Sequence, residues 1–236
     1  SDVCSSDLFV RINIETAGNT MYWYSMLSNS VKDTSEFRYT IFGNVFSQYI
    51  KPDIDLSYHL LVNPSNKVIL RIAGGVGITY GNSKDLSLPF DKAFFIGGAN
   101  DVRAWQARSL GPGSYSDAGD IENGGDMKIL GNIEYRSSIF KKLEIAAFAD
   151  AGNVWLINDK NTKLEGSLFD AGKFYKEVAF GAGLGIRLNF DFFIIRTDFG
   201  LKLYNPALDH SERWVYGHQK FVIGQIVPNL AIGYPF

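Results

Sequence analysis

Eight segments of the chain alternate between apolar residues on one parity and polar or very small residues on the other. The last segment extends to the C terminus and places these residues on its apolar face: Ile226, Pro228, Leu230, Ile232, Tyr234 and Phe236. Successive side chains of a β-strand point to opposite faces, so the pattern predicts strands with one apolar and one polar face. An apolar face must be covered by a protein core or by lipid. Which of the two covers it distinguishes a soluble β-protein from a membrane β-barrel.

The seven earlier segments are predicted to be strands at residues 8–16, 45–62, 67–80, 127–137, 143–152, 178–190 and 192–203. The connections between strands alternate in length. Three are tight, at residues 63–66, 138–142 and 189–191. Four are long and polar, at residues 17–44, 81–126, 153–177 and 205–225. Short turns on one side and long loops on the other are typical of outer-membrane β-barrels.

A soluble β-sandwich is the alternative, because alternation alone is compatible with it. Three features favour a membrane barrel instead. The polar parity carries many glycines, several loops exceed the usual length for a compact domain, and aromatic residues gather at the strand ends, where interfacial girdles lie. These aromatic residues are Tyr80, Tyr135, Phe190, Phe193, Tyr204, Tyr234 and Phe236.

Composition narrows the possibilities further. The chain has 236 residues, and no apolar run approaches the roughly 20 residues of a membrane helix. A formal net charge of −2 gives no indication of a nucleic-acid partner. The single cysteine, Cys4, excludes an internal disulfide. Residues 1–7 are polar and fit none of the later pattern, so we expect a non-native or disordered start, with the barrel portion at residues 8–236.

The long loop at residues 81–126 contains the sequence FFIGGANDVRAW at positions 94–105. This segment resembles the inward-folded loop of the BamA/TamA superfamily (the bacterial surface antigen family), in which a GG…VRG(F/Y) motif reaches into the barrel lumen. Gly97, Gly98, Val102 and Arg103 match the motif, and Trp105 takes the aromatic place. Ala104 departs from the glycine usual in the family. The next residues, 106–113, resemble the TamA-like branch of Bacteroidetes.

Two strands after the loop extend the resemblance, which covers residues 95–236. Positions 131–136 read GNIEYR, and positions 148–155 resemble an F-x-D-x-G-x-x-W strand that includes Phe148, Asp150 and Gly152. The family barrel has sixteen strands, so the resemblance implies an all-β antiparallel transmembrane barrel of which this chain is the C-terminal half. A barrel of eight strands closing on itself is the competing account. A half barrel has two unpaired edges, so we expect that this chain alone forms no stable closed barrel.

The resemblance implies that Arg103 docks against Glu134 and Asp150, which both lie on the polar, lumen-facing parity. A planar guanidinium fork suits carboxylates, and we predict that this clamp holds the loop in the lumen. The alternative is that Arg103 lies in a solvated loop and that Glu134 and Asp150 line a water-filled channel. Very small residues on the polar parity predict a part of the inner wall without bulky side chains, called here the bare wall. It leaves room for the loop to pack closely, or its glycines permit strand curvature, and both explanations stay open. The residues of the bare wall are Ala73, Gly75, Gly77, Gly181, Gly183 and Gly185.

The terminal strand is the candidate for the mechanism. In the family it pairs weakly with the first strand and leaves a seam that opens sideways. Gly233 and Pro235 weaken strand pairing, since proline lacks a donor and glycine is a poor strand former. Phe236 is then the terminal aromatic residue of this seam. The alternative is that it serves only as a signal for insertion into the outer membrane.

No enzyme, cofactor or metal site is predicted. His59 lies on the lumen parity with Asp55 and Ser57, but no G-x-S-x-G motif positions a nucleophile, and His210 and His218 lie in a polar loop. An acidic stretch lacks the D-x-D-x-D-G spacing of a calcium loop, and a solvated loop is the expectation for its residues. They are Asp117, Asp120, Glu122 and Asp126.

The resemblance implies an outer-membrane assembly or translocation factor that inserts or exports client proteins. The implied partners are outer-membrane lipids and client outer-membrane proteins, with periplasmic or inner-membrane accessory proteins as further candidates. Two alternatives stay open: a passive pore or transporter barrel, and a barrel that anchors an enzyme domain fused upstream. POTRA repeats before residue 1 would favour assembly, whereas a lipase-like G-x-S-x-G would favour the fusion.

Overall fold

The computed structural model describes residues 6–28, 38–116, 123–158, 164–190, 192–218 and 223–236. Eight long antiparallel strands form one sheet, and their order across it is β1 (Ser6–Ala17), β4 (Tyr49–Asn63), β5 (Asn66–Val76), β7 (Met127–Phe140), β8 (Leu143–Trp155), β9 (Ala179–Asn189), β10 (Ile194–Tyr204) and β11 (Ile226–Ile232). A short strand, β6 (Ile78–Thr79), pairs with the start of β4.

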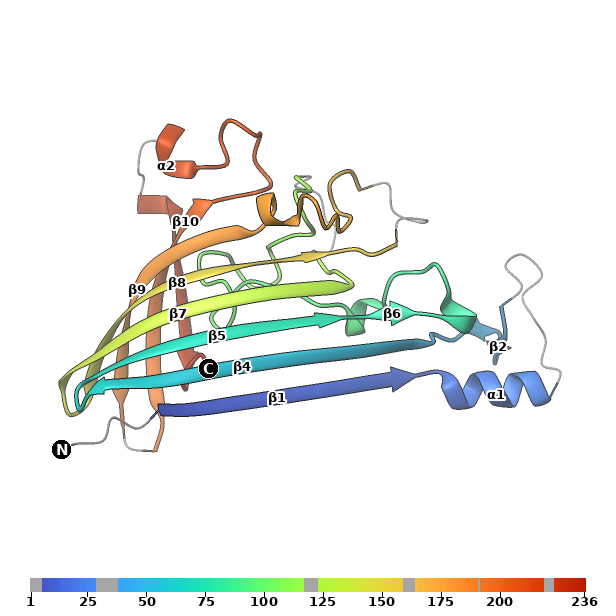
Figure 1. Cartoon of the computed structure of the whole chain (residues 1–236), viewed down its shortest axis with the longest axis horizontal. Helices are drawn as coiled ribbons and strands as arrows, with labels where there is room; N and C mark the ends of the chain where they lie inside the picture. Colours follow the sequence, from blue (N-terminus) through green and yellow to red (C-terminus); the bar gives the residue numbers. More distant parts are fainter. Residues whose placement is uncertain (1–5, 29–37, 117–122, 159–163, 191, 219–222) are drawn as a thin grey trace.

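The sheet curls into part of a barrel, with β1 and β11 as its two edges (Figure 1). Each long strand pairs with its neighbour in antiparallel register; β7 and β8, for example, pair from Met127↔Trp155 to Phe140↔Leu143. All eight predicted strands are present, so the predicted fold class, a partial antiparallel β-barrel, is confirmed. Among the described residues, no helix is long and apolar enough to cross a membrane.

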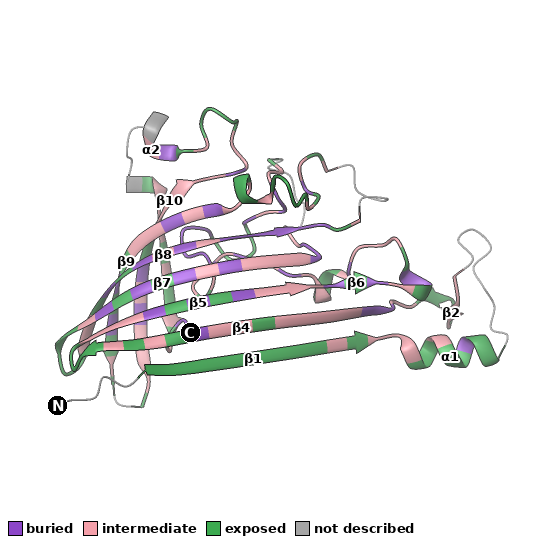
Figure 2. Cartoon of the chain, in the orientation of Figure 1, coloured by how far each residue is buried: buried purple, intermediate pink, exposed green. Residues whose placement is uncertain are grey.

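The faces that are buried and exposed are the reverse of those in a soluble β-sandwich. On β7 the apolar parity, including Ile133 and Tyr135, is exposed, whereas Asn132, Glu134 and Arg136 on the polar parity are buried. The same alternation occurs on β5, β8, β9 and β10, whereas edge strand β1 is exposed along most of its length (Figure 2). An apolar outer face with a polar interior is the arrangement of a barrel in lipid. The soluble-sandwich alternative requires the reverse and is wrong.

The loop between β6 and β7 supplies most of the buried core. It includes two 3₁₀ turns, η1 (Gly81–Ser83) and η2 (Phe90–Lys92), and it packs against the inner face of β5, β7, β8 and β9. The apolar cluster consists of Ala73, Phe94, Ile96, Val102, Ala104, Trp105, Leu110, Leu130, Val154 and Ala179. The lumen of this partial barrel is therefore occupied by its own chain.

Several strand boundaries differ from the prediction. Strand β1 begins at Ser6, because Ser6 and Asp7 pair with Leu60 and His59; the rest of the predicted irregular start, residues 1–5, lies outside the described residues. The strand predicted from residue 45 begins only at Tyr49. The strand predicted to reach residue 80 is interrupted after Val76, and β6 follows.

The long connections contain elements that alternation did not predict. Between β1 and β4 lie helix α1 (Asn19–Leu27) and the small hairpin of β2 (Thr40–Ile41) with β3 (Asn44–Val45). The later connections hold η3 (Phe174–Lys176), the short helix α2 (Val215–His218) and η4 (Ile223–Gln225). These elements gather at the end of the sheet opposite the tight turns (Figure 1).

The prediction that Tyr234 and Phe236 lie on the apolar face of the last strand is wrong. Neither residue extends the outward apolar face. Strand β11 ends at Ile232, and Gly233, with φ +89°, turns the chain while its N–H donates to the Ile194 carbonyl. Only glycine adopts this left-handed conformation readily. The Tyr234 hydroxyl then reaches the Glu144 carboxylate on the polar parity, and the Phe236 ring lies 5.4 Å from the Arg71 guanidinium.

Candidate functional site

The lumen loop contains a tight hairpin. Bridges join Phe94 to Gly125 and Ile96 to Leu110, and the N–H of Gly98 donates to the Trp105 carbonyl at 2.8 Å. Gly97 and Gly98 have φ values of +113° and +87°. A Cβ at Gly97 would lie 2.1 Å from the Gln106 carbonyl oxygen. The two glycines therefore permit both the backbone conformation and the close approach of the hairpin arms.

The hairpin places Arg103 against the lumen wall, where the residue is fully buried. Its Nε and Nη2 donate to the two carboxylate oxygens of Asp150 at 2.9 and 2.8 Å, and its backbone N–H donates to Asp150 at 3.0 Å. Its Nη1 donates to Glu134. The guanidinium also lies 3.6 Å from the centre of the Phe148 ring. The structure thus brings together Arg103, Glu134, Phe148 and Asp150.

Glu134 and Asp150 belong to a larger buried ionic network. Arg136 and Arg187 also donate to Glu134, the latter at 2.9 Å. Asp198 on β10 is paired with Arg187 at 2.8 Å and with Arg196 at 2.7 Å. With Arg103 and Asp150, the network contains four arginines and three carboxylates, all almost completely buried. Such a set is stable only while its members remain paired, because an isolated buried charge is costly.

The tip of the loop, residues 99–103, bonds to wall side chains on both sides of the network. Arg71 on β5 donates to the Asn100 carbonyl at 2.7 Å, and Asn132 on β7 donates to the Asp101 carbonyl at 2.7 Å. Arg196 on β10 donates to the Ala99 carbonyl at 2.7 Å.

The last strand completes these contacts. Asn229 on β11 donates to the Arg103 carbonyl at 2.8 Å. Together with Asp150 on β8, these side chains tie one short segment of loop to five strands.

The bare wall has a clear packing role at some glycines. A Cβ at Gly77 would lie 2.2 Å from Leu88, and one at Gly181 would lie 2.4 Å from the Cβ of Ala104. Gly75 similarly faces Phe94. These positions leave room for the loop, whereas Gly183 and Gly185 lie against the wall itself; their nearest neighbours are the Phe199 backbone and the side chains of Phe148, Arg187 and Asp198.

Other predicted residues take their places around this site. Val102, Ala104 and Trp105 are buried in the apolar cluster, so Ala104 in the family's glycine position fits beside Gly181. Gly152 lies close to the neighbouring strand, where a Cβ would be 2.7 Å from the Ile129 carbonyl oxygen.

Sequence reasoning missed several wall residues that belong to the ionic network or bond to the loop tip. They are Arg71, Asn132, Arg136, Arg187, Arg196, Asp198 and Asn229. Their lumen-facing parity was visible in the sequence and was the available signal. Parity shows which face a side chain occupies, but it does not show which partner the side chain meets.

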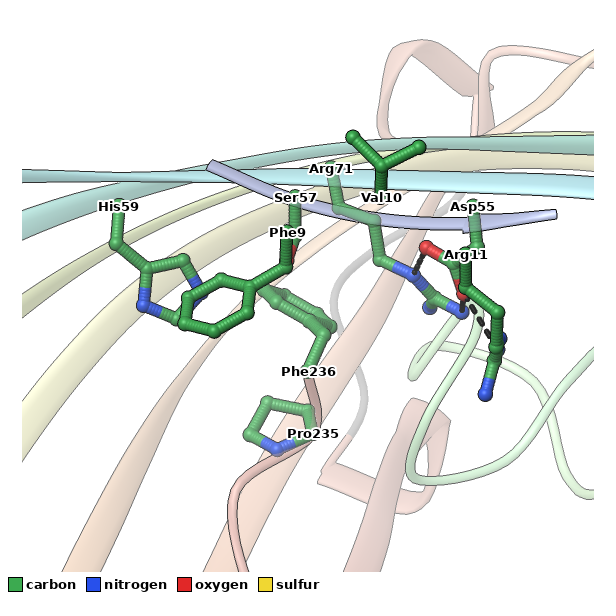
Figure 3. A pocket seen from close by; sticks show the side chains of 9 residues that line it. All are labelled: Phe9, Val10, Arg11, Asp55, Ser57, His59, Arg71, Pro235 and Phe236. Carbon is green, nitrogen blue, oxygen red and sulfur yellow. Dashed lines mark hydrogen bonds and ion pairs between the residues drawn. The ribbon is translucent and has the colours of Figure 1, made fainter. Parts of the chain in front are cut away.

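A cavity of about 470 Å³ lies between the β1–β4 wall and the C-terminal residues (Figure 3). Asp55, Ser57 and His59 line it together with Phe236. The Asp55 carboxylate is occupied by Arg71 and Arg11, each at 2.8 Å. Within the described part of the chain, His59 Nε2 has no hydrogen-bond partner, so these residues do not form a relay between a base and a nucleophile.

The acidic stretch is only partly described, because residues 117–122 lie outside the described ranges. Asp126, expected in a solvated loop, is buried instead; its carboxylate accepts the N–H groups of Leu88 at 2.7 Å and Ile157 at 3.1 Å. His210 is exposed as expected, and the side chain of His218 lies outside the described residues. No cluster of three potential metal ligands occurs among the residues whose positions are described.

Comparison with known proteins gives a consistent picture. The Omp85 superfamily domain matches residues 23–226. Outer membrane protein assembly factor BamA of Neisseria meningitidis is 28% identical over 137 residues, covering 50% of this chain and 17% of that protein. The crystal structure of BamA from Haemophilus ducreyi lacking POTRA domains 1–3 resembles 96% of this chain with a TM-score of 0.52 at 12% identity. This chain covers 50% of that structure, so it spans half or less of the length of these relatives.

Proposed function

Because the chain belongs to the Omp85 superfamily, we propose that it forms the C-terminal half of an outer-membrane barrel that inserts or translocates other proteins. The superfamily match and the likeness to BamA support outer-membrane localisation and a family-level role in assembly or translocation. Membership of the TamA-like branch, and of Bacteroidetes, remains a prediction from residues 106–113.

The observation that carries the proposal is the loop bound across the lumen wall. A passive pore needs an open path, but here the loop tip is bonded to β5, β7, β8, β10 and β11. We infer that the Arg103 clamp holds this loop in place against the wall. Its burial and its several charge-assisted hydrogen bonds support a fixed position.

The last strand supports a seam that opens sideways. Its pairing with β10 covers seven residues, from Ile195↔Ile232 to Leu201↔Ile226, whereas β10 itself has eleven. Pro228 within it lacks an N–H donor, and the chain leaves the strand direction at Gly233. A short, interrupted edge strand is easier to separate and can template a strand from another protein. We therefore propose client outer-membrane proteins as partners at this edge.

The outward apolar face is proposed to contact outer-membrane lipids, and periplasmic or inner-membrane accessory proteins are proposed as further partners. The residues of the site suit binding and positioning of the loop.

The proposal is tested by depleting the full-length protein in its host and quantifying folded barrel proteins in the outer membrane. A broad or client-specific loss, restored by the wild-type gene and not by an Arg103→Ala variant expressed at the same level, would support assembly. Unchanged barrels with altered uptake of small solutes would indicate the pore instead. A parent protein with an upstream catalytic domain and unchanged barrels would indicate an enzyme anchor.

A further inference from the structure

Helix α1 follows edge strand β1 without an intervening loop. Gly18, with φ +78°, is the only residue between the strand and the helix. The helix has the sequence NTMYWYSML and contains no charged residue. An uncharged helix in a long, otherwise polar connection is unexpected, so its environment requires an explanation.

One side of α1 is fixed to the protein. The Asn19 side chain accepts hydrogen bonds from Gln48 Nε2 at 2.9 Å and from the Tyr80 hydroxyl at 2.7 Å. Tyr22 packs edge-on against Tyr39, with ring centres 5.5 Å apart. These contacts hold the helix at the end of β4 and β6, opposite the tight turns.

The other side of α1 is apolar and uncovered. Trp23, Tyr24 and Leu27 are 71%, 67% and 78% exposed, respectively. Figure 2 shows the helix mostly in the colour of exposed residues. Exposed single apolar residues are ordinary, but a contiguous group with Trp and Tyr indicates an interaction surface.

This surface lies directly beyond the loop-side end of β1 (Figure 1). The outward row of β1 consists of exposed apolar residues, Leu8, Val10, Ile12 and Ile14. The strand ends with Glu15, Thr16 and Ala17, so its loop-side end carries no aromatic residue of its own. Next to the opposite edge of the sheet, exposed Trp214 lies beside Tyr204 at the loop-side end of β10. Helix α1 thus supplies aromatic residues where β1 lacks them.

We propose that α1 is an interfacial helix whose outer face lies in the headgroup region of the outer leaflet and anchors the loop-side end of β1. Tryptophan and tyrosine favour the boundary between hydrocarbon and water, because each has an apolar body and a polar tip. Without charged residues, the helix binds through buried apolar area rather than through attraction to lipid phosphates. The inference rests on the proposed membrane placement of the barrel, and it adds a lipid contact outside the strands.

The test measures depth in the membrane with nitroxide spin labels. Single cysteines replace Leu27, Ile12 or Asp209 in the full-length protein lacking native cysteines, reconstituted in phospholipid vesicles. Collisions with oxygen, which concentrates in the bilayer, are compared with collisions with a water-soluble nickel chelate. We expect the ratio of oxygen to nickel collisions at Leu27 to exceed that at exposed Asp209 several-fold and to fall below that at Ile12.

A double variant, Trp23→Ser with Tyr24→Ser, is expected to lower this ratio at Leu27 toward the Asp209 value, with Ile12 unchanged. Phe42→Ser in the neighbouring hairpin, where the side chain is also exposed, is the matched control and should change nothing. A water-like Leu27 beside a lipid-like Ile12 would overturn the interfacial helix while leaving the barrel placement intact. A water-like Ile12 would overturn the barrel placement itself. A Leu27 label shielded from both reagents would show a protein cover and also overturn the proposal.

Discussion

The side chain of Asn229 donates a 2.8 Å hydrogen bond to the backbone carbonyl of Arg103, 126 residues earlier in the chain. This bond joins the edge strand β11 directly to the residue that we propose as the anchor of the lumen loop. Phe236 adds a second connection, since its ring centre lies 5.7 Å from the Arg103 guanidinium. Movement of the last strand and release of the loop are therefore expected to be coupled.

Replacing Asn229 by alanine leaves the Arg103 carbonyl without its donor. An unsatisfied buried acceptor costs about 1–3 kcal/mol, so we expect faster amide hydrogen exchange in both β11 and the loop tip. Asn13 is the matched control because it lies in the other edge strand and donates to Asp53 at an exposed site. If Asn229→Ala speeds exchange in β11 alone, the strand and the loop are not coupled through this bond.

Replacing Arg103 by alanine leaves Glu134 and Asp150 without their shared partner. Breaking a buried ion pair from one side costs about 3–5 kcal/mol, so we expect the loop of a folded Arg103→Ala or Arg103→Glu barrel to become sensitive to protease. Arg103→Lys retains the charge but not the fork and should give intermediate protection. Arg11→Ala removes an exposed pair with Asp55 and serves as the control. Unchanged protection of the loop in Arg103→Glu would exclude the clamp.

Adding one methyl group at Gly181 tests whether the bare wall exists for the loop. The new Cβ would lie 2.4 Å from the Cβ of Ala104, so Gly181→Ala should destabilise the docked loop by about 1–3 kcal/mol. Gly131→Ala is the control, because its new Cβ would meet nothing closer than 4.0 Å. Equal unfolding free energies for the two variants, measured by urea titration in vesicles, would favour strand curvature as the reason for Gly181.

Removing the aromatic ring of Phe236 tests the role of the C terminus. The ring lies within 6 Å of the guanidinium groups of Arg71, Arg103 and Arg136, at 5.4, 5.7 and 5.9 Å. Phe236→Leu should lower the unfolding free energy by roughly 1–2 kcal/mol, whereas Phe236→Tyr should retain the value of the wild type. Phe192→Leu, at an exposed turn, is the control. Equal losses in Phe236→Leu and Phe236→Tyr would contradict a stabilising contact between ring and cations.

The sequence predicts the strands well because a membrane barrel imposes a period of two on every strand. The motif resemblance also brought Arg103, Glu134 and Asp150 together, since a short specific motif determines a local geometry. It could not predict that Arg187 and Arg196 share Asp198, because these contacts depend on the register between the neighbouring strands β9 and β10. The period also placed Phe236 on the wrong face. The turn at Gly233 ends the strand, and the terminal ring lies beside guanidinium groups in the lumen instead.

Asp126 predicts a dependence of stability on pH. Burial raises the pKa of its carboxyl above the usual value of 3.8, although hydrogen bonds from backbone N–H groups, among them those of Leu88 and Ile157, act in the opposite direction. A raised pKa means that the folded protein holds the proton more tightly than the unfolded chain. The stabilising contribution is therefore complete below the unfolded-state pKa and is lost as the pH rises through the folded-state pKa. We expect Asp126→Asn to reduce this loss as the pH rises above about 4.

The measurement is the free energy of unfolding, followed by tryptophan fluorescence in vesicles across that range. Asp209→Asn is the control, because Asp209 is an exposed carboxylate outside the loop. Burial also raises the pKa of Glu177, so some decline with pH should remain in Asp126→Asn. If Asp126→Asn and the wild type lose stability equally as the pH rises, the Asp126 proton does not contribute to holding the end of the loop between Leu88 and Ile157.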